Sequence, residues 1–151
     1  MWIVLALITA PWRRISLYEG GWTWIPTVFL FLIGLWLYKN SGKHFSGAQL
    51  SGTAELLPSH AEQRLVISGI RNRIRHPVYL GHLCEMLAWS IGTGLAVAYA
   101  LSAFAAITGV IMIRLEDKEL EQRFGEEYRR YRSQVPALIP SLWKPSLAQR
   151  R

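Results

Sequence analysis

The sequence predicts an all-α integral membrane protein with three to four transmembrane helices, in which a C-terminal helical hairpin extends into a cytoplasmic amphipathic helix. Two observations support this prediction. Hydrophobic residues make up 51% of the 151 residues, and they gather in long uncharged runs at 22–38 and 95–113. Lys and Arg outnumber Asp and Glu by 17 to 10 and stand beside these runs, as the positive-inside rule expects. The length suits a single domain, residues 1–151.

The first half of the chain contains one clear membrane span and one apolar segment that is too short to be assigned as a span. Residues 1–12 are apolar, but ten helical residues cover only about 15 Å, roughly half the hydrocarbon core of a bilayer. They would span only if Pro11-Trp12 extends the helix or the bilayer thins, and otherwise they would form an interfacial or re-entrant segment. Residues 22–38 form a span with aromatic residues at both ends, where interfacial belts belong. Residues 39–77 contain several glycines and a basic end, which indicates a cytoplasmic loop.

The second half is predicted to be a helical hairpin that continues into water. Pro77 opens the first helix, because proline is well tolerated in a first turn. The hairpin covers residues 78–113, with a Gly-Thr-Gly tip. A cytoplasmic helix follows over residues 114–135, and a basic tail occupies 136–151. The loop before the hairpin and this tail carry the basic excess, so both should be cytoplasmic.

Composition argues against several other classes of protein. The net charge of +7 would suit nucleic acid, but no nucleic-acid motif accompanies it, so we expect no nucleic-acid partner. The single cysteine, Cys84, cannot form an intrachain disulfide. No Cys/His cluster has the spacing of a zinc site, and we expect no metal. The first residues lack the basic start and the cleavage site of a signal peptide.

The helix after Arg114 has an apolar face that also contains an acidic residue. Apolar and aromatic side chains recur there at steps of three, four and seven, which is the period of one helical stripe. Glu116 lies on this stripe, and a buried carboxylate costs desolvation energy unless it has a partner. Glu116 is therefore a functional candidate, and the alternative is a structural ion pair with Arg114 or a loop arginine. The stripe comprises Ile113, Leu120, Phe124, Tyr128, Tyr131 and Val135.

Histidines mark the first turns of the hairpin. Helix N-termini bind anions, so His76 with Arg75 would suit a carboxylate such as the amino-acid end of a cofactor. The alternative for His76 is an ordinary loop residue. His82 and Glu85 share a face one to two turns further on. Ionisable residues within a span are candidates for function, and the alternative is that these two pair with each other.

Three segments between residues 60 and 140 carry recognisable motifs. The first, residues 65–69, reads Leu-Val-Ile-Ser-Gly, and the second, residues 75–81, reads Arg-His-Pro-Val-Tyr-Leu-Gly. The third runs from Glu116-Asp117 through Phe124-Gly125 to Val135-Pro136. Together they resemble isoprenylcysteine carboxyl methyltransferase and its phospholipid-methylating relatives. The resemblance implies a membrane methyltransferase that binds S-adenosyl-L-methionine on the cytoplasmic side. A lipid or small lipophilic substrate would enter from the bilayer, and the cofactor would enter from water.

The resemblance also implies roles for particular residues. Glu116 matches a family glutamate at the junction of cofactor and substrate, and with Arg114 it is expected to be catalytic. The cofactor is expected to contact the end of the loop, the start of the hairpin and the final helix. The expected cofactor-binding residues are Gln63, Arg64, Leu65, Val66, Arg75, His76, Pro77, Val78, Tyr79, Gly81, Leu120 and Tyr128.

The chain departs from the family pattern at three places, of which the acidic pair Glu116-Asp117 is a mild change. Arg71 stands where the family often has a tyrosine. Met112 stands where the eukaryotic isoprenylcysteine enzymes carry a substrate-contacting arginine, and the nearest arginine, Arg114, faces another side of the helix. These departures weaken the inference of a prenylcysteine substrate but leave the inferred cofactor in place.

Two other functions fit the same motifs. Sterol reductases have a similar His-Pro-x-Tyr-x-Gly motif and bind NADPH, so an NADPH-dependent membrane reductase is one alternative. A non-catalytic membrane protein that keeps the fold is the other. For a methyltransferase, the sequence does not specify whether oxygen, nitrogen or sulfur accepts the methyl group. A carboxylate acceptor needs no base, whereas an amine or thiol does, and Glu116, His82 or Glu85 could then supply it. The oligomeric state also stays open.

Overall fold

The computed structural model describes residues 10–11, 15–18, 20–42, 65 and 67–139. Within these ranges the chain is helical, and the extended pairing is limited to one isolated antiparallel bridge between Ser16 and Leu95. The predicted all-α class is confirmed for this part of the chain. The elements are η2 (Gly21–Thr23), α2 (Trp24–Gly42), η3 (Gly69–Asn72), α5 (Pro77–Thr93), α6 (Ala96–Phe124) and α7 (Glu126–Gln134).

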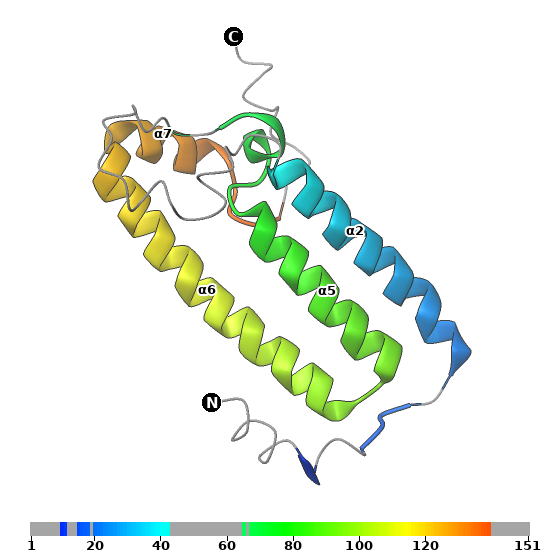
Figure 1. Ribbon diagram of the computed structural model, residues 1–151. Helices are drawn as coiled ribbons and strands as arrows, with labels where there is room; N and C mark the ends of the chain where they lie inside the picture. The colour runs from blue at the N-terminus through cyan, green and yellow to red at the C-terminus, as the bar shows by residue number, and fades with distance from the viewer. Residues whose placement is uncertain (1–9, 12–14, 19, 43–64, 66, 140–151) are drawn as a thin grey trace.

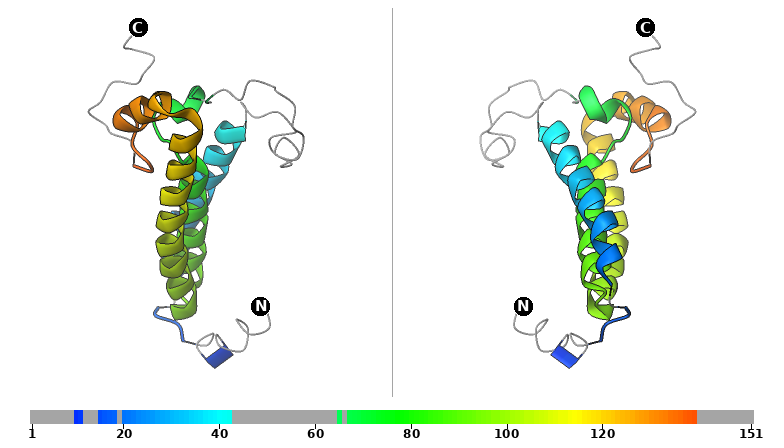
Figure 2. Two further views of the ribbon diagram at one scale, coloured as in Figure 1. Left: turned by 90° about the vertical axis from the view of Figure 1, so that its left-hand side faces the viewer. Right: turned by 90° about the vertical axis from the view of Figure 1, so that its right-hand side faces the viewer.

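Three long helices lie side by side, with α5 between α2 and α6 (Figure 1). The short helix α7 turns across one end of this row, where α2 and α6 end and α5 begins. The side views show the three helices as a thin slab with α7 and η3 gathered at that same end (Figure 2). The slab therefore leaves wide helix faces uncovered, and its polar parts are concentrated at one end.

Two of these helices are long and apolar enough to cross a membrane. Residues Gly21–Ser41 and Ala96–Phe124 have 18-residue windows with mean hydropathies of 1.5 and 2.1, of which only 17% and 11% are buried. Large side chains such as Trp36 and Phe104 point outward, 58% and 64% exposed. A helix from a soluble core would bury such side chains, so these faces are suited to lipid. The predicted runs at 22–38 and 95–113 are confirmed as apolar helices.

Helices α5 and α6 occupy the residues expected to form a hairpin, and the turn between them has a clear conformational cause. Helix α5 ends at Thr93, and Gly94 takes the left-handed conformation with φ 65° and donates its N–H to Ser90 O over 2.9 Å. A side chain at Gly94 would also lie 2.7 Å from Tyr18 O. Glycine is the residue that tolerates both conditions. Buried hydroxyls of Ser90 and Ser102, 2.8 Å apart, then join α5 to α6.

The predicted continuous helix of residues 114–135 is wrong in one respect. Gly125, with φ 56° and ψ −129°, ends α6, and α7 begins in a new direction at Glu126. The break allows the apolar stripe to fold back over the chain segment before α5. Tyr128, Tyr131 and Val135 form a buried cluster there, packed against Leu65, Ile67, Leu120 and Phe124.

Helices α2 and α5 approach closely because glycines lie at their contact. A Cβ atom added to Gly81 would stand 2.8 Å from Cε1 of Tyr38, and one added to Gly34 would stand 2.9 Å from Cγ of Glu85. These distances are shorter than any ordinary carbon–carbon contact. Gly81, which the sequence placed in the cofactor site, therefore faces α2 and lets the ring of Tyr38 lie against the α5 backbone.

Substitution of Gly81 tests this packing. We expect Gly81→Ala to lower the free energy of unfolding by about 1–3 kcal/mol, because the added methyl group displaces the Tyr38 ring. Gly109→Ala is the matched control, since its added methyl group would meet only Cδ1 of Tyr79 at 3.9 Å. Thermal unfolding in detergent measures both variants. Equal behaviour of the two variants would contradict a close α2–α5 contact at Gly81.

Candidate functional site

The carboxylate of Asp117 joins the three segments that meet at the polar end of the slab. Its Oδ1 accepts hydrogen bonds from Arg75 Nη1, from the hydroxyl of Tyr128 and from His76 Nε2, the last over 2.8 Å. Arg75 and His76 precede α5, Asp117 lies in α6 and Tyr128 lies in α7. Only 4% of Asp117 is exposed. Burial raises the pKa of this carboxyl, but the bonds from Arg75, Tyr128 and His76 outweigh burial and lower it to about 2.

Arg75 is part of this framework. Its Nε donates to Val135 O over 2.9 Å, and its Nη1 also donates to the Tyr128 hydroxyl over 3.1 Å. Its backbone N–H donates to Pro136 O, again over 2.9 Å. These partners occupy the guanidinium and leave its side chain 8% exposed. Arg75 and Tyr128, both expected at the cofactor, are therefore committed to holding the helices together.

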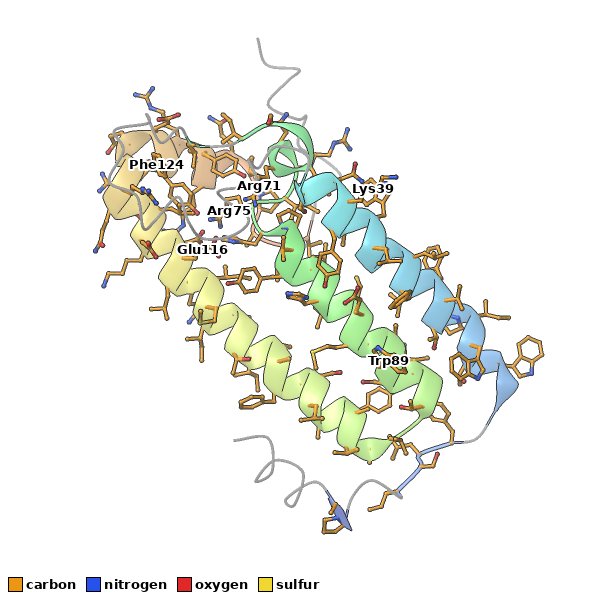
Figure 3. The ribbon with its side chains drawn as sticks, in the orientation of Figure 1. Lys39, Arg71, Arg75, Trp89, Glu116 and Phe124 are labelled. Atoms are coloured by element: carbon orange, nitrogen blue, oxygen red, sulfur yellow. The ribbon has the colours of Figure 1, made fainter. Side chains whose placement is uncertain are left out.

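A cavity of about 370 Å³ lies beside this framework. It lies where η3, the first turns of α5 and the charged part of α6 meet, and Figure 3 shows Arg71, Arg75 and Glu116 gathered at that end. The volume falls at the lower end of the usual range for small-molecule sites. Its walls combine charged, aromatic and apolar side chains. They are formed by Arg71, His76, Pro77, Val78, Tyr79, His82 and Glu116.

Glu116 contributes a carboxylate to this cavity and is held by its neighbours. Its Oε2 lies 3.4 Å from Nδ1 of His76, and its side chain is 41% exposed. Hydrogen bonding from His76 lowers the pKa of Glu116, burial opposes the shift, and Tyr79 and Arg71 act in the same direction as His76. Glu116 lies beyond Ile113, the last residue of the uncharged run in α6. The cavity therefore holds a stable negative charge at the edge of the apolar slab.

His76 is positioned by both acidic residues of α6. Each of its ring nitrogens faces one carboxylate, Nε2 that of Asp117 and Nδ1 that of Glu116. Its backbone N–H donates to Ala137 O over 2.9 Å, and its ring meets the edge of Tyr79 with centroids 5.8 Å apart. His76 is 3% exposed, so it is fixed in one orientation at the start of α5. It links the buried framework to the cavity wall.

The structure brings together several of the residues that the sequence singled out. His76, Pro77, Val78, Tyr79 and Glu116 all line the cavity. Other expected site residues lie elsewhere: Leu65 and Leu120 pack on the tyrosine cluster, and Arg114 is exposed on α6 outside the cavity lining. Gln63, Arg64 and Val66 lie outside the described residues.

Sequence reasoning missed Asp117 and placed Glu116 on the buried face. Asp117 follows the buried Ile113 by four residues, and Glu116 follows it by three, so both lie near one stripe. The structure buries Asp117 because Arg75 and Tyr128 converge on it. The step of four from Ile113 was the available signal. Two further residues line the cavity. His82 was considered only as a possible base with Glu85, and Arg71 was noted only as a departure from the family pattern.

Comparison with known proteins assigns the sequence to a family. A sequence model of phospholipid methyltransferases matches residues 22–127, more than half of the chain. The chain belongs to the phospholipid methyltransferase family. The match begins in η2, just before α2, and runs through α5 and α6 into α7, so it includes every described residue that lines the cavity.

Several curated proteins are similar to this chain over only part of their own length. Methanethiol S-methyltransferase 1 of Bradyrhizobium diazoefficiens is 38% identical over 77 residues, which are 49% of this chain and 25% of the relative. Protein-S-isoprenylcysteine O-methyltransferase B of Arabidopsis thaliana is 34% identical over 82 residues, 51% and 40% of the two chains. A Delta(14)-sterol reductase of Mus musculus is 27% identical over 124 residues, 76% and 29% of the two chains. The chain therefore spans a quarter to two fifths of the length of these relatives.

Replacement of Asp117 tests the framework of this phospholipid methyltransferase family member. We expect Asp117→Asn to lower the free energy of unfolding by about 3–5 kcal/mol, because it leaves the guanidinium of Arg75 buried without an opposite charge. Glu121→Gln is the matched control. It removes a carboxylate one turn further along α6, where the partners Arg129 and Arg132 are exposed, and should change stability little. A comparable loss in both variants, measured by unfolding in detergent, would contradict the framework.

The pH dependence of stability provides a second test of the Asp117 carboxylate. Because the pKa of Asp117 is about 2 in the folded protein and its ordinary value is 3.8, the unfolded chain binds more protons between these values. The stabilising contribution should be present above the ordinary pKa of 3.8 and be lost as the pH falls through about 2. The stability difference between the wild type and Asp117→Asn should shrink over this interval. A difference that stays constant would show that Asp117 does not carry the charge.

Proposed function

We propose that this chain is a membrane-embedded methyltransferase that uses S-adenosyl-L-methionine and acts on a lipophilic small molecule or lipid. The observation that carries the proposal is the mixed-charge cavity of His76, Tyr79 and Glu116 at the boundary between the apolar and charged parts of α6. Membership of the phospholipid methyltransferase family supports the chemistry. The outward-facing apolar helices support the membrane location.

The residues that line the cavity suit this cofactor. S-adenosyl-L-methionine carries a carboxylate, an ammonium group and a sulfonium, and it supplies a methyl group bound to that sulfonium. Arg71 offers a guanidinium for a carboxylate, and Glu116 offers a carboxylate for a cation. The ring of Tyr79 offers an aromatic face, which attracts cations. Glu116 is held as an anion by His76, so it is prepared for a positively charged partner.

The position of the cavity provides two approaches. The uncharged part of α6 ends at Ile113, and the cavity begins about one turn later at Glu116. An acceptor dissolved in the bilayer can reach the cavity along the apolar faces of α5 and α6, and the cofactor can reach it from water. Lys39, Arg71 and Arg75 lie at the same end, and by the positive-inside rule this basic end supports a cytoplasmic location for the cavity.

Methyl transfer at such a site depends on positioning. The reaction is an in-line displacement in which positive charge disperses, so the chain's main tasks are to orient the reactants and to exclude water. His76 and Tyr79 fix the cofactor wall, and Pro77 and Val78 form its apolar part. Met112 and Arg114 are both exposed outside the cavity lining. The arrangement thus gives no support to a contact between Arg114 and the acceptor.

Cofactor binding tests the proposal. By calorimetry on detergent-purified protein, we expect S-adenosylmethionine and S-adenosylhomocysteine to bind and Glu116→Gln to weaken S-adenosylmethionine binding by about 10- to 100-fold, through loss of a charge-assisted contact. Glu119→Gln is the matched control, because Glu119 is exposed on the same helix. The match to a sterol reductase makes NADPH the informative competitor. Binding of NADPH alone would favour a reductase, and binding of neither cofactor would favour a non-catalytic protein.

A further inference from the structure

The outer face of α6 changes from apolar to basic at the end of its uncharged part. Exposed apolar side chains recur on this face at steps of four residues, as Ile107, Ile111 and Leu115. Lys118, three residues after Leu115, is exposed on the same face. Arg114 is exposed too, three residues after Ile111 and four before Lys118. Arg114 and Lys118, the basic pair, thus end an exposed apolar stripe.

The basic pair lies where one surface of a bilayer would meet α6. Residues 96–113 of this helix are uncharged and cover about 27 Å along its axis. The hydrocarbon core of a bilayer is about 30 Å thick. At the opposite end of the slab, Trp22 and Trp89 are exposed, as expected of aromatic side chains at the other interface (Figure 3). The basic pair therefore stands at the depth of lipid headgroups.

Acidic residues on α6 do not neutralise this pair. Asp117, three residues after Arg114, is committed to the buried framework, and Glu121, three after Lys118, pairs with arginines of α7. Glu119 directly follows Lys118, and adjacent residues of a helix do not face each other. Within the described residues, neither member of the basic pair makes an ion pair. Like charges four residues apart on a helix repel each other, so an anion bound between them would relieve that repulsion.

We propose that this face of α6 binds a phospholipid with a net negative charge. The phosphate lies between Arg114 and Lys118, and an acyl chain lies along Ile107, Ile111 and Leu115. A soluble anion or a nucleic acid would match only the basic pair. A lipid matches both parts of the face, because its charged and apolar parts are separated in the same way.

The charge of the pair selects among lipids. A zwitterionic headgroup carries an ammonium group of its own, which partly cancels the attraction of its phosphate for two cations. A headgroup with a net negative charge has no such compensation. Each Lys or Arg near an anionic membrane surface strengthens binding by about 5-fold. Arg114 and Lys118 should therefore favour an anionic lipid over a zwitterionic one of the same chain length.

This lipid site lies apart from the cavity. Glu116 lines the cavity and Arg114 does not, since two residues along a helix turn the side chain by about 200°. The bound lipid thus does not deliver the group that reacts. It holds this end of α6 at the membrane surface and so sets the depth of Glu116. The site goes beyond the methyltransferase function proposed above and does not rest on it.

Native mass spectrometry of the detergent-purified chain, without any methyl donor, tests the proposal. The protein is titrated with palmitoyl-oleoyl phosphatidylglycerol, whose net charge is negative, and with the zwitterionic phosphatidylcholine of the same acyl chains. We expect the phosphatidylglycerol to bind more tightly. Arg114→Gln and Lys118→Gln should each weaken its binding by about 5-fold and leave binding of the phosphatidylcholine unchanged.

Two further variants separate the site from the charge of the whole chain. Arg130→Gln is the matched control, because Arg130 is exposed on α7, where the tyrosines are buried and no apolar stripe adjoins it. It should bind phosphatidylglycerol as the wild type does. Arg114→Lys keeps the charge and should retain most of the binding. Thermal unfolding in detergent shows whether each variant is folded, and Lys118→Gln gives an independent result if Arg114→Gln is not.

Three outcomes would overturn the proposal. Equal affinity of the wild type for the two lipids would show that the basic pair only reaches into water. A loss in Arg130→Gln as large as that in Arg114→Gln would show that the net charge of the chain decides binding. Displacement of phosphatidylglycerol by millimolar inorganic phosphate would show a site for any anion. None of these results bears on the proposed function, which is tested separately by cofactor binding.

Discussion

The buried carboxylate of Asp117 is the interaction on which the polar end of this protein depends. It collects Arg75 and His76 from the segment before α5 and Tyr128 from α7 around one oxygen of α6. Such an arrangement costs desolvation energy, which is offset only when every charge and donor is paired. The pairing has a geometric result. It fixes the imidazole of His76 between Asp117 and Glu116, and so it shapes the wall of the cavity.

The two neighbouring acids of α6 thus have different tasks because they point in different directions. Consecutive helical residues are turned by about 100° from each other, so Asp117 faces the buried framework while Glu116 reaches the cavity. The same helix is uncharged up to Ile113 and charged from Arg114. Helix α6 therefore carries, in chain order, a lipid-facing surface, the cavity residue Glu116 and the framework residue Asp117.

The sequence predicted much of this arrangement, and its failures have physical reasons. Uncharged runs and the Gly-Thr-Gly tip predicted the apolar helices and the hairpin, since both are local properties. The burial of Asp117 depends on Arg75, 42 positions earlier in the chain, and no local period reveals such a contact. The break at Gly125 was hidden because the step from Phe124 to Tyr128 keeps the helical period across it. The placement of Gly81 against Tyr38 likewise required knowledge of α2.

The central claim is that the cavity between His76, Tyr79 and Glu116 holds the methyl-donor cofactor, and a structure with S-adenosylhomocysteine tests it most directly. The account predicts that the molecule lies in this cavity, with its amino-acid end near Arg71 or Glu116 and with the Asp117 framework unchanged. Bound S-adenosylhomocysteine at another place, with this cavity empty, would contradict the account.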